Sequence, residues 1–294
     1  MKKVSVIIPA FNCAATVKES ALSALEDNKD SVAELVFVDD KSTDETLSIL
    51  RVLEEDYPSM KIICHDQNYG GALARNTAVR HCSEDYIFCL DSDNILVPGS
   101  LSQLVAFADQ NAADVASFRE LHFFTGKKTN VTHLWRYPAG PFTFADYVAG
   151  TVVPGASGNY LFKKSAWEDV GGYRAGSGAL DSWVFGLDLV ANQKKMYVSP
   201  DGFYYHRYGI SSYWVRENIN QKAGLLATNL IEKYLRQMDE DSQNWIRNSA
   251  GDWFDQIDLK PLRLAGSDVG HAGEIVYKSM LMRIRMRLAQ KIYS

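Results

Sequence analysis

The first third of the chain alternates between short apolar runs and longer segments of helical periodicity, and this alternation restricts the fold more than any other feature. Apolar runs of strand length lie at residues 4–8, 35–38, 61–64 and 86–90. Most are apolar on both faces, as strands buried within a parallel sheet are. Helical patterns lie between and after them, at residues 16–26, 44–56, 71–82 and 98–109. The sequence therefore predicts βαβ units and a Rossmann-like α/β fold with a mostly parallel central sheet.

Polar residues follow each of the four predicted strands. They occupy residues 9–12, 39–40, 65–68 and 91–94, and two of these segments carry paired carboxylates. In open parallel sheets, ligands bind outside the carboxyl ends of the strands. Carboxylates gathered on one rim repel each other unless a cation or hydrogen-bond donors meet them. We therefore expect the binding site at this edge of the sheet.

The rest of the chain is less regular. Residues 114–207 mix strand-like segments, such as 159–163 and 203–206, with loops rich in glycine and aromatic residues, and residues 180–191 have a helical pattern. Beyond Tyr213 the chain is helical through residues 218–235 and acidic over residues 239–258. We expect one domain over residues 1–212, followed by a mainly helical C-terminal extension over residues 213–294.

Composition and charge exclude several classes of protein. The 294 residues are 46% hydrophobic and 12% aromatic, which is enough to fill a sizeable core. A formal net charge of -5 argues against a nucleic-acid binder, which would carry a basic surface. The four cysteines lack the close-paired spacing of zinc sites, which favours a reducing compartment.

The N-terminus could imitate a signal peptide, because Lys2 and Lys3 precede an apolar run. Pro9 interrupts that run, and no small-residue cleavage site follows, so a first strand explains the segment better. No stretch approaches the ~20 apolar residues that a membrane span requires. We therefore expect a cytoplasmic protein, peripheral to the inner face of the membrane at most.

The triplet Asp91-Ser92-Asp93 is the sharpest chemical feature. Two aspartates one residue apart at the end of a strand can present hard oxygen ligands to Mg²⁺ or Mn²⁺ and to the phosphates that such a cation binds. The spacing alone is a weak signal, because it recurs at residues 239–241 in a polar helical stretch that is most simply a solvated face. The preceding apolar strand favours Asp91 and Asp93, with Asp93 the stronger candidate for direct metal contact.

Asp39 and Asp40 end the second predicted strand. Carboxylates in this place could accept hydrogen bonds from a nucleobase N–H or from ribose hydroxyls. Alternatively, one of them turns the chain or caps the following helix, although Asp44 suits the capping role better.

Four segments in register carry a resemblance to a known family. They read VSVIIPAFN, VDDKSTDET, NYGGALARN and LDSD, at residues 4–12, 38–46, 68–76 and 90–93. In this order they resemble the family 2 glycosyltransferases. The resemblance covers about the first hundred residues closely, and the four blocks together are highly specific. It implies a GT-A type nucleotide-diphospho-sugar transferase fold and inversion at the anomeric carbon.

The same resemblance implies roles for individual residues. Residues 1–115 would form the nucleotide-sugar-binding half and residues 116–212 the acceptor-binding half. The nucleoside would contact Pro9, Phe11, Asn12, Asp39 and Asp40. The remaining donor contacts would come from Asn68, Gly71, Arg75, Asn76, Asp91, Ser92 and Asp93, with Asp91 and Asp93 also holding Mn²⁺ or Mg²⁺.

The resemblance weakens after Asp93. Such enzymes commonly take their base from the Asp of a Glu-Asp pair that opens a helix, and here Asp181 occupies the expected place while Leu180 replaces the Glu. Asp181 is therefore the predicted general base, and a plain N-cap is the alternative. His206 could be a third metal ligand or a hydrogen-bonded core residue. Asn159 could face the acceptor or form a turn.

These observations predict a metal-dependent, hexosyltransferase-like enzyme. It would move one sugar from a nucleotide-diphosphate-sugar, by family precedent a UDP-sugar, to a hydroxyl of a glycan or lipid-linked acceptor in cell-surface polysaccharide biosynthesis. The alternative is a degenerate homologue that binds sugar nucleotides or glycans without turnover. A nucleotidyltransferase is disfavoured, because residues 9–12 contain no glycine- and lysine-rich phosphate loop.

The C-terminal segment from Lys278 to Lys291 carries five basic residues and no acidic one. It could attract anionic lipid headgroups and so make a weak peripheral membrane contact. Its apolar residues alternate with a period of two, however, so a helix would scatter the arginines around its circumference. A solvated tail or a docking element is the alternative.

Overall fold

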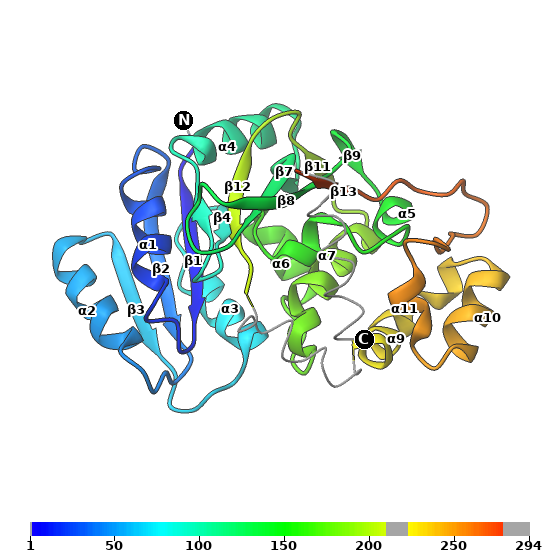
Figure 1. Cartoon of the computed structure of the whole chain (residues 1–294), viewed down its shortest axis with the longest axis horizontal. Helices are drawn as coiled ribbons and strands as arrows, with labels where there is room; N and C mark the ends of the chain where they lie inside the picture. Colours follow the sequence, from blue (N-terminus) through cyan, green and yellow to red (C-terminus); the bar gives the residue numbers. More distant parts are fainter. Residues whose placement is uncertain (1, 210–222, 279–294) are drawn as a thin grey trace.

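The computed structural model describes residues 2–209 and 223–278. Within these residues, eight strands form the larger of two sheets, in the order β3-β2-β1-β4-β10-β6-β11-β9 (Figure 1). Strands β1 to β4 pair in parallel, as do β6 and β11, whereas β10 and β9 run antiparallel to their neighbours. The predicted α/β fold with a mostly parallel sheet is confirmed. The strands are β1 (Val4–Ala10), β2 (Val32–Asp39), β3 (Met60–Cys64), β4 (Tyr86–Cys89), β6 (Val115–Ser117), β9 (Gly140–Phe142), β10 (Leu161–Lys163) and β11 (Met196–Val198).

The four predicted helices of the first third are present, with ends shifted by no more than two residues. They are α1 (Val17–Leu25), α2 (Thr46–Asp56), α3 (Gly71–Arg80) and α4 (Ser100–Gln110). Strand β4 is buried at every residue and β1 at all but Pro9, because helices and further strands cover both faces of the sheet. Helix α3 packs against β1 and β2 and also reaches α7. It therefore links the first half of the chain to the second.

A second sheet of five strands, in the order β13-β8-β7-β12-β5, lies beside the first within the described residues. The sequence predicted only β12 of this sheet. Strand β5 follows directly after residues 91–94 and pairs antiparallel with β12, so that Tyr205 lies opposite Ile95. This pairing brings the residues after β4 next to the end of β12. The strands are β5 (Ile95–Leu96), β7 (Glu120–Phe124), β8 (Val131–Arg136), β12 (Phe203–Arg207) and β13 (Glu274–Tyr277).

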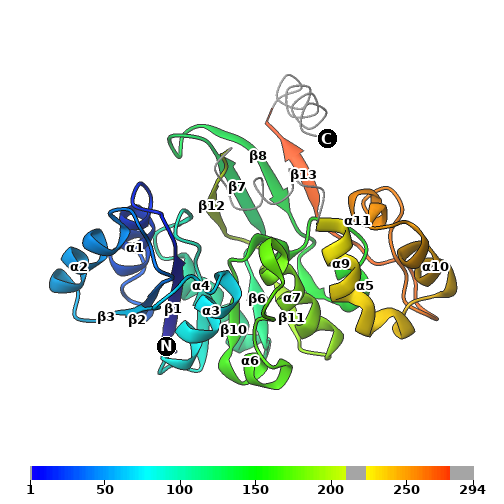
Figure 2. The same ribbon diagram turned by 90° about the horizontal axis from the view of Figure 1, so that it is seen from below.

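The second half supplies α5 (Phe144–Tyr147), α6 (Lys164–Val170) and α7 (Asp181–Ala191), the last in the place predicted for a helix. The predicted C-terminal helical extension is also confirmed, as α9 (Ala223–Ile231), α10 (Glu240–Asn248) and α11 (Asp252–Gln256). The second acidic triplet opens α10, where Asp239 is the N-cap and accepts a hydrogen bond from the Ser242 N–H at 2.8 Å. The chain then returns to the second sheet, where β13 pairs with β8 (Figure 2).

The C-terminal helices are fastened to α7 through Asp188, which is fully buried. The Asp188 carboxylate accepts hydrogen bonds from the Arg174 guanidinium and from the Tyr234 hydroxyl, the latter at 2.5 Å. Arg174 also donates to the Leu230 carbonyl of α9 at 2.7 Å. Buried side chains of the extension belong to the same hydrophobic cluster as the central sheet. Helices α1 and α2 and helices α9 to α11 lie at opposite ends of the molecule (Figure 1).

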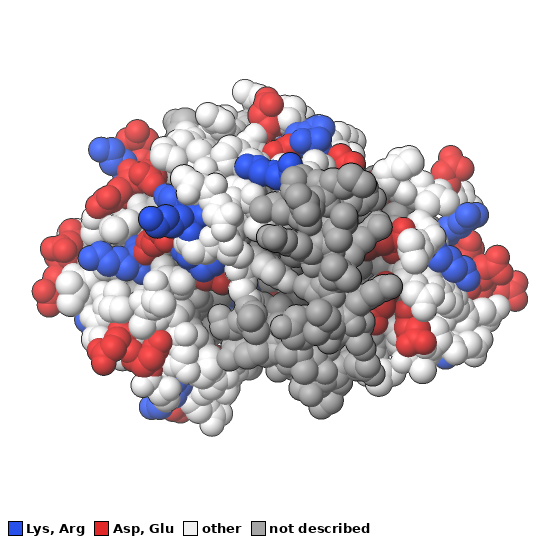
Figure 3. All heavy atoms as spheres, viewed as in Figure 1, with Lys and Arg blue, Asp and Glu red and all other residues white. Residues whose placement is uncertain are grey.

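Charges of both signs are mixed at both ends of the face shown in Figure 3, so no extended basic surface is visible there. Among residues 2–209 and 223–278, no helix combines the length and the apolar character that crossing a membrane needs. The basic segment predicted to attract lipid headgroups lies outside the described residues, apart from Lys278.

Candidate active site

Asp39 ends β2 at the carboxyl edge of the central sheet, beside Ala10 of β1. The residue is 3% exposed. Its Oδ2 accepts a hydrogen bond from the Ser42 N–H at 3.3 Å, whereas Oδ1 is buried and has no partner among the described residues. An unpaired buried carboxylate oxygen costs folding free energy, so this atom is poised to accept an N–H or O–H group from a ligand.

Asp40 has a different environment, although it is the next residue. Its carboxylate accepts hydrogen bonds from the Tyr69 N–H at 2.9 Å and the Gly70 N–H at 2.7 Å, and it pairs with His65 Nδ1 at 2.6 Å. His65 Nε2 lies 3.0 Å from the Thr77 hydroxyl of α3. Asp40 therefore holds the turn that precedes α3, and His65 ties the same carboxylate to the body of that helix.

The segment after β1 lies against the loop after β2. Asn12, in the left-handed region at φ 49°, accepts the Thr43 N–H at 2.8 Å and donates its own N–H to the Ser42 hydroxyl at 3.0 Å. Pro9 pairs with Val38 in the sheet register, and Phe11 is 45% exposed at the same edge. The geometry thus brings Pro9, Phe11 and Asn12 to the edge of the sheet at which β2 ends with Asp39.

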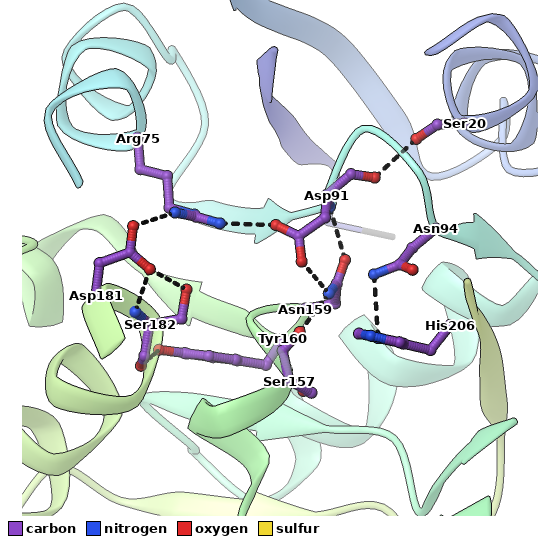
Figure 4. Close-up of polar contacts among 10 residues, drawn as sticks. All are labelled: Ser20, Arg75, Asp91, Asn94, Ser157, Asn159, Tyr160, Asp181, Ser182 and His206. Carbon is purple, nitrogen blue, oxygen red and sulfur yellow. Dashed lines mark hydrogen bonds and ion pairs between the residues drawn. The ribbon is translucent and has the colours of Figure 1, made fainter. Parts of the chain in front are cut away.

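Arg75 of α3 connects two carboxylates that are distant in sequence (Figure 4). Its Nη1 lies 2.5 Å from Asp181 Oδ2 and its Nη2 lies 2.7 Å from Asp91 Oδ1. The guanidinium also lies over the Tyr173 ring, 5.7 Å from its centroid. Gly71, one turn earlier, leaves room for this ion pair, because a Cβ there would lie 2.6 Å from Asp181 Oδ2 and 2.7 Å from Arg75 Nη1.

Asp181 is the first residue of α7, and Leu180 is the N-cap position. Its Oδ1 accepts hydrogen bonds from the Ser182 N–H at 2.6 Å and the Ser182 hydroxyl at 3.1 Å. Burial raises the pKa of Asp181 and the charge of Asp91 adds to this effect, while Arg75 opposes it. The result is a buried carboxylate that is more basic than an ordinary aspartate, a property that would suit a general base.

Asp91 is held on two sides. Arg75 reaches Oδ1, and the Asn159 side chain donates to Oδ2 at 2.8 Å while accepting the Asp91 N–H at 2.7 Å. The Ser20 hydroxyl donates to the Asp91 carbonyl at 3.0 Å (Figure 4). Asn159 is fully buried, so the structure assigns it to Asp91, a role that the sequence alone did not suggest.

Asp93 has a less satisfied carboxylate. Burial raises the pKa of Asp93 to about 7, and the charge of Asp91 adds to this shift, while Arg207 opposes it. Arg207 also donates its Nε–H to the Asp93 carbonyl at 3.1 Å, and it pairs with Glu19 at 2.7 Å. Arg207 is a functional candidate that the sequence reasoning missed, because it comes from β12, far along the chain from Asp93.

His206 lies on β12, close to the end of β4. Its Nδ1 is 3.3 Å from the Nδ2 of Asn94, and its ring packs against Phe123 at 4.6 Å between centroids. Burial lowers the pKa of His206 to about 4, with Asp91 opposing, so the imidazole is neutral at physiological pH. Asn94, which the sequence reasoning gave no role, is fully buried at this junction.

Three residues predicted to contact the donor have other surroundings: Asn76 is engaged within the protein, Asn68 is exposed and Ser92 is partly buried. The Asn76 amide is engaged within the protein: it donates to the Tyr173 carbonyl at 2.7 Å and accepts from the Tyr173 N–H at 2.8 Å and Trp167 Nε1 at 2.9 Å. It therefore joins α3 to the loop before α7 and does not face a nucleotide. Asn68 is exposed on the turn held by Asp40, and Ser92 is partly buried between the two aspartates.

The residues present fit a divalent cation bound partly by substrate. Within the described ranges, no group of three or more His, Cys, Asp or Glu side chains has metal-holding geometry. Mg²⁺-type sites, however, often use one or two carboxylates and complete their shell with phosphate oxygens and water. Burial and the neighbouring charge of Asp91 raise the pKa of Asp93, and a bound cation would oppose both effects.

The family model described as glycosyl transferase family 2 matches residues 5–171, which is more than half of the chain. The chain belongs to glycosyltransferase family 2. The family resemblance inferred from the four sequence segments is thereby confirmed.

Two curated relatives of this family 2 chain are named as sugar transferases. One is the UDP-Glc:alpha-D-GlcNAc-diphosphoundecaprenol beta-1,3-glucosyltransferase WfaP of Escherichia coli, 36% identical over 37% of this chain and 42% of the relative. The other is the poly(ribitol-phosphate) beta-N-acetylglucosaminyltransferase TarP of Staphylococcus aureus, 27% identical over 70% of this chain and 62% of the relative. The chain thus matches less than two thirds of either relative.

Solved structures share the fold. The crystal structure of S. aureus TarS in complex with UDP-GlcNAc aligns with a TM-score of 0.63 at 20% identity, covering 84% of this chain and 71% of that one. The Pyrobaculum calidifontis mannosyltransferase PcManGT, solved with GDP-Man and Mn²⁺, aligns with a TM-score of 0.61 at 20% identity, covering 87% of this chain and 73% of that one. The GT-A fold implied by the sequence resemblance is confirmed.

Proposed function

We propose that this family 2 glycosyltransferase moves a single sugar from a nucleoside-diphosphate-sugar to a hydroxyl group of a glycan or lipid-linked acceptor, with inversion at the anomeric carbon. The observation that carries the proposal is the buried ion-pair chain from Asp181 through Arg75 to Asp91. It joins a candidate base to the first aspartate of the Asp91-Ser92-Asp93 triplet at the carboxyl edge of the sheet. The names of the two relatives support a role in cell-surface glycan biosynthesis.

The nucleoside end of the donor would lie against Asp39. Its buried Oδ1 has no partner in the described part of the chain and needs a donor, which a pyrimidine or purine ring N–H beside a carbonyl supplies. Uracil, thymine and guanine carry such an N–H, whereas the corresponding ring nitrogen of cytosine is an acceptor. The exposed ring of Phe11 offers a surface for stacking on the base. We favour UDP, the nucleotide present in the TarS complex.

The diphosphate end carries excess negative charge. Asp91, Asp93 and Asp181 face two guanidinium groups, Arg75 and Arg207, and Arg207 is already paired with Glu19. An anionic diphosphate would add to this charge, so we expect Mn²⁺ or Mg²⁺ to bind with it. Asp93 would be the main protein ligand, because both oxygens of Asp91 are engaged by Arg75 and Asn159. When bound, the cation would neutralise charge that grows on the leaving diphosphate.

Transfer would be a single displacement. The acceptor hydroxyl oxygen forms the new bond to the anomeric carbon as the bond from that carbon to the diphosphate breaks. Asp181 takes the hydroxyl proton, and the nucleoside diphosphate leaves with the bonding electrons. General-base assistance of this kind is worth about 10²–10⁴-fold. Arg75 would keep Asp181 oriented and ionised until the acceptor displaces part of their contact.

A second candidate function is donor binding without turnover. It is favoured by Leu180, which stands where related enzymes carry a Glu and is 2% exposed in the core. Assays of donor binding and sugar transfer in the wild type and in Asp181→Asn separate the two functions. An enzyme should keep donor binding and lose transfer in this variant, whereas a binding protein shows no transfer in the wild type either.

Calorimetry tests the donor site directly. UDP, GDP, dTDP and CDP should each be titrated with and without Mn²⁺ against wild type, Asp93→Asn and Asp241→Asn. The last variant is the matched control, because Asp241 belongs to the second acidic triplet and is exposed on α10. We expect one nucleotide to bind tightly, only with Mn²⁺, and with loss of affinity in Asp93→Asn alone. Failure of every nucleotide with Mn²⁺ present would refute the proposal.

A further inference from the structure

The orientation of the Asn94 side chain determines which ring nitrogen of His206 carries the hydrogen. The Asn94 side chain is fully buried and contacts β12 twice. Its Oδ1 accepts the backbone N–H of Arg207 at 2.9 Å, and its Nδ2 lies 3.3 Å from Nδ1 of His206. A backbone N–H can only donate, so the atom facing Arg207 must be the amide oxygen. The atom facing His206 is therefore the amide nitrogen, which also can only donate.

The imidazole of His206 must accept this hydrogen bond. Nδ1 therefore carries a lone pair, and the ring hydrogen of the neutral imidazole resides on Nε2. A protonated ring would place an Nδ1–H against the N–H of Asn94, with two donors facing each other. The antiparallel pairing of β12 with β5, with Tyr205 opposite Ile95, holds the backbone of both partners in this register. One tautomer is thus built into the fold.

This tautomer is the reverse of the one that a ligand bound through Nε2 needs, and Nδ1, the nitrogen with the lone pair, already accepts the hydrogen bond from Asn94. Histidines that bind metal through Nε2 donate their Nδ1–H to a carboxylate, a carbonyl or water. His206 meets a donor where such an acceptor would have to be, and its Nε2 presents a hydrogen atom. The role of third metal ligand, which the sequence suggested for His206, therefore disagrees with the hydrogen bonding around its ring.

We propose that His206 is a neutral N–H donor to the diphosphate of the bound sugar nucleotide and is not a metal ligand. The inference rests on the proposed function for the identity of its acceptor, but its tautomer stands on the structure alone. Its location supports the role, because Asn94 directly follows Asp93 and its side chain contacts the His206 ring. A donor aimed at the leaving diphosphate would stabilise the charge that develops there without any proton transfer.

Long-range ¹H–¹⁵N correlation on ¹⁵N-histidine-labelled protein tests the tautomer without any ligand. Assigned with His206→Gln, the resonances should show an unprotonated Nδ1 and a protonated Nε2 at neutral pH. A protonated Nδ1 with a free Nε2 would overturn the proposal. This experiment depends on neither nucleotide binding nor turnover, so it remains decisive if the proposed function fails.

Electron spin echo envelope modulation of the Mn²⁺–UDP complex tests the metal shell. We expect no modulation from a directly bound imidazole ¹⁴N in the wild type. Such modulation, if it disappears in His206→Ala, would assign His206 to the metal and sink the proposal. If wild type binds neither UDP nor Mn²⁺, the proposed donor function fails, and the tautomer result stands separately.

Kinetics complete the test with two variants at the same position. His206→Ala should lower kcat by about 10²-fold, as loss of one preorganised donor does. His206→Gln places an amide N–H near the position of Nε2 and should recover most of that loss. Equal loss in both variants would argue against the donor role. Asn94→Asp offers the converse, because a carboxylate facing Nδ1 favours the Nδ1–H tautomer, and imidazole ¹⁴N modulation should then appear.

Discussion

Gly71→Ala is the most direct test of the ion pair at the centre of the site, because it moves the reacting groups without deleting any of them. A Cβ at this position would lie 2.6 Å from Asp181 Oδ2 and 2.7 Å from Arg75 Nη1. Ordinary contact begins at 3.4 Å, so the two side-chain ends must shift by about 0.8 Å. Displacements near 1 Å in a catalytic group can lower rates by about 10²-fold. We therefore expect kcat to fall by roughly 10-fold to 10²-fold.

The same substitution should leave the fold nearly as stable as before. Gly71 is the first residue of α3, and alanine in a helix is favoured over glycine by about 0.5–1 kcal/mol. The atoms in the way are the far ends of two side chains and not backbone, so their displacement costs little folding free energy. We expect the free energy of unfolding to change by less than about 1 kcal/mol. Transfer kinetics, UDP calorimetry and denaturant unfolding measure the three quantities.

Gly99→Ala is the matched control for this experiment. Gly99 precedes α4 with a φ of 71°, and a Cβ there meets no atom within 4 Å. The left-handed backbone should cost an alanine about 1–2 kcal/mol of stability, while turnover stays at the wild-type level. Gly71→Ala should thus lower kcat with little change in stability, whereas Gly99→Ala should lower stability with unchanged kcat. Wild-type kcat in Gly71→Ala would refute the claim that the placement of Asp181 and Arg75 limits catalysis.

Three further predictions concern the other aspartates of the site. The raised pKa of Asp93, about 7 against 3.8 for an ordinary carboxyl, means that the metal-free protein loses stability as pH rises through this interval. Asp93→Asn should therefore stabilise the metal-free protein by about 1–3 kcal/mol at about pH 8 and make no difference below about pH 4, as measured by urea unfolding. Asp39→Asn should weaken UDP binding by about 10-fold to 10²-fold in calorimetry while leaving the fold intact, because it impairs an unpaired acceptor. Asp40→Asn should instead lower the free energy of unfolding by about 1–3 kcal/mol, because it weakens the acceptor of the Tyr69 and Gly70 N–H groups. A loss of UDP affinity with an unchanged free energy of unfolding would contradict this assignment.

The first third of the fold was predictable because its signals are local and long. Strands β1 to β4 are mostly apolar runs, and the helices between them have clear periodicity. The second sheet was not, because its strands gain stability from partners that are distant in sequence. Strand β5 has only two residues, Ile95–Leu96, and β13 consists of exposed and partly buried residues. Neither pattern differs from that of a loop until the pairing with β12 and β8 is known.

The candidate site divides in the same way. Residues carried by contiguous motifs, such as Asp39 and Asp93, could be named from the sequence. Their partners could not, because a polar residue in an irregular segment has no periodic signal. Asn159 lies 68 residues from Asp91, and Arg207 lies 114 residues from Asp93. The antiparallel pairing of β10 with β4 and of β12 with β5 brings those side chains to the edge at which β4 ends.

The two acidic pairs of the site follow one physical rule. In each pair, one carboxylate is saturated by the protein and the other is left short of partners. Asp40 is held by backbone N–H groups, while Asp39 has a buried oxygen that no group in residues 2–209 or 223–278 pairs with. Asp91 is held by Arg75 and Asn159 while burial raises the pKa of Asp93.

This division has a cause in electrostatics. Two neighbouring carboxylates left without partners would repel each other and destabilise the edge of the sheet. Hydrogen-bond donors within the chain must therefore compensate the charge of one of them. The saturated member then fixes a loop or a guanidinium in place, and the unsaturated member stays available for the ligand. In each pair, replacing the aspartate that binds the donor should therefore stabilise the protein when metal and nucleotide are absent. Replacing the aspartate that positions the site should destabilise it.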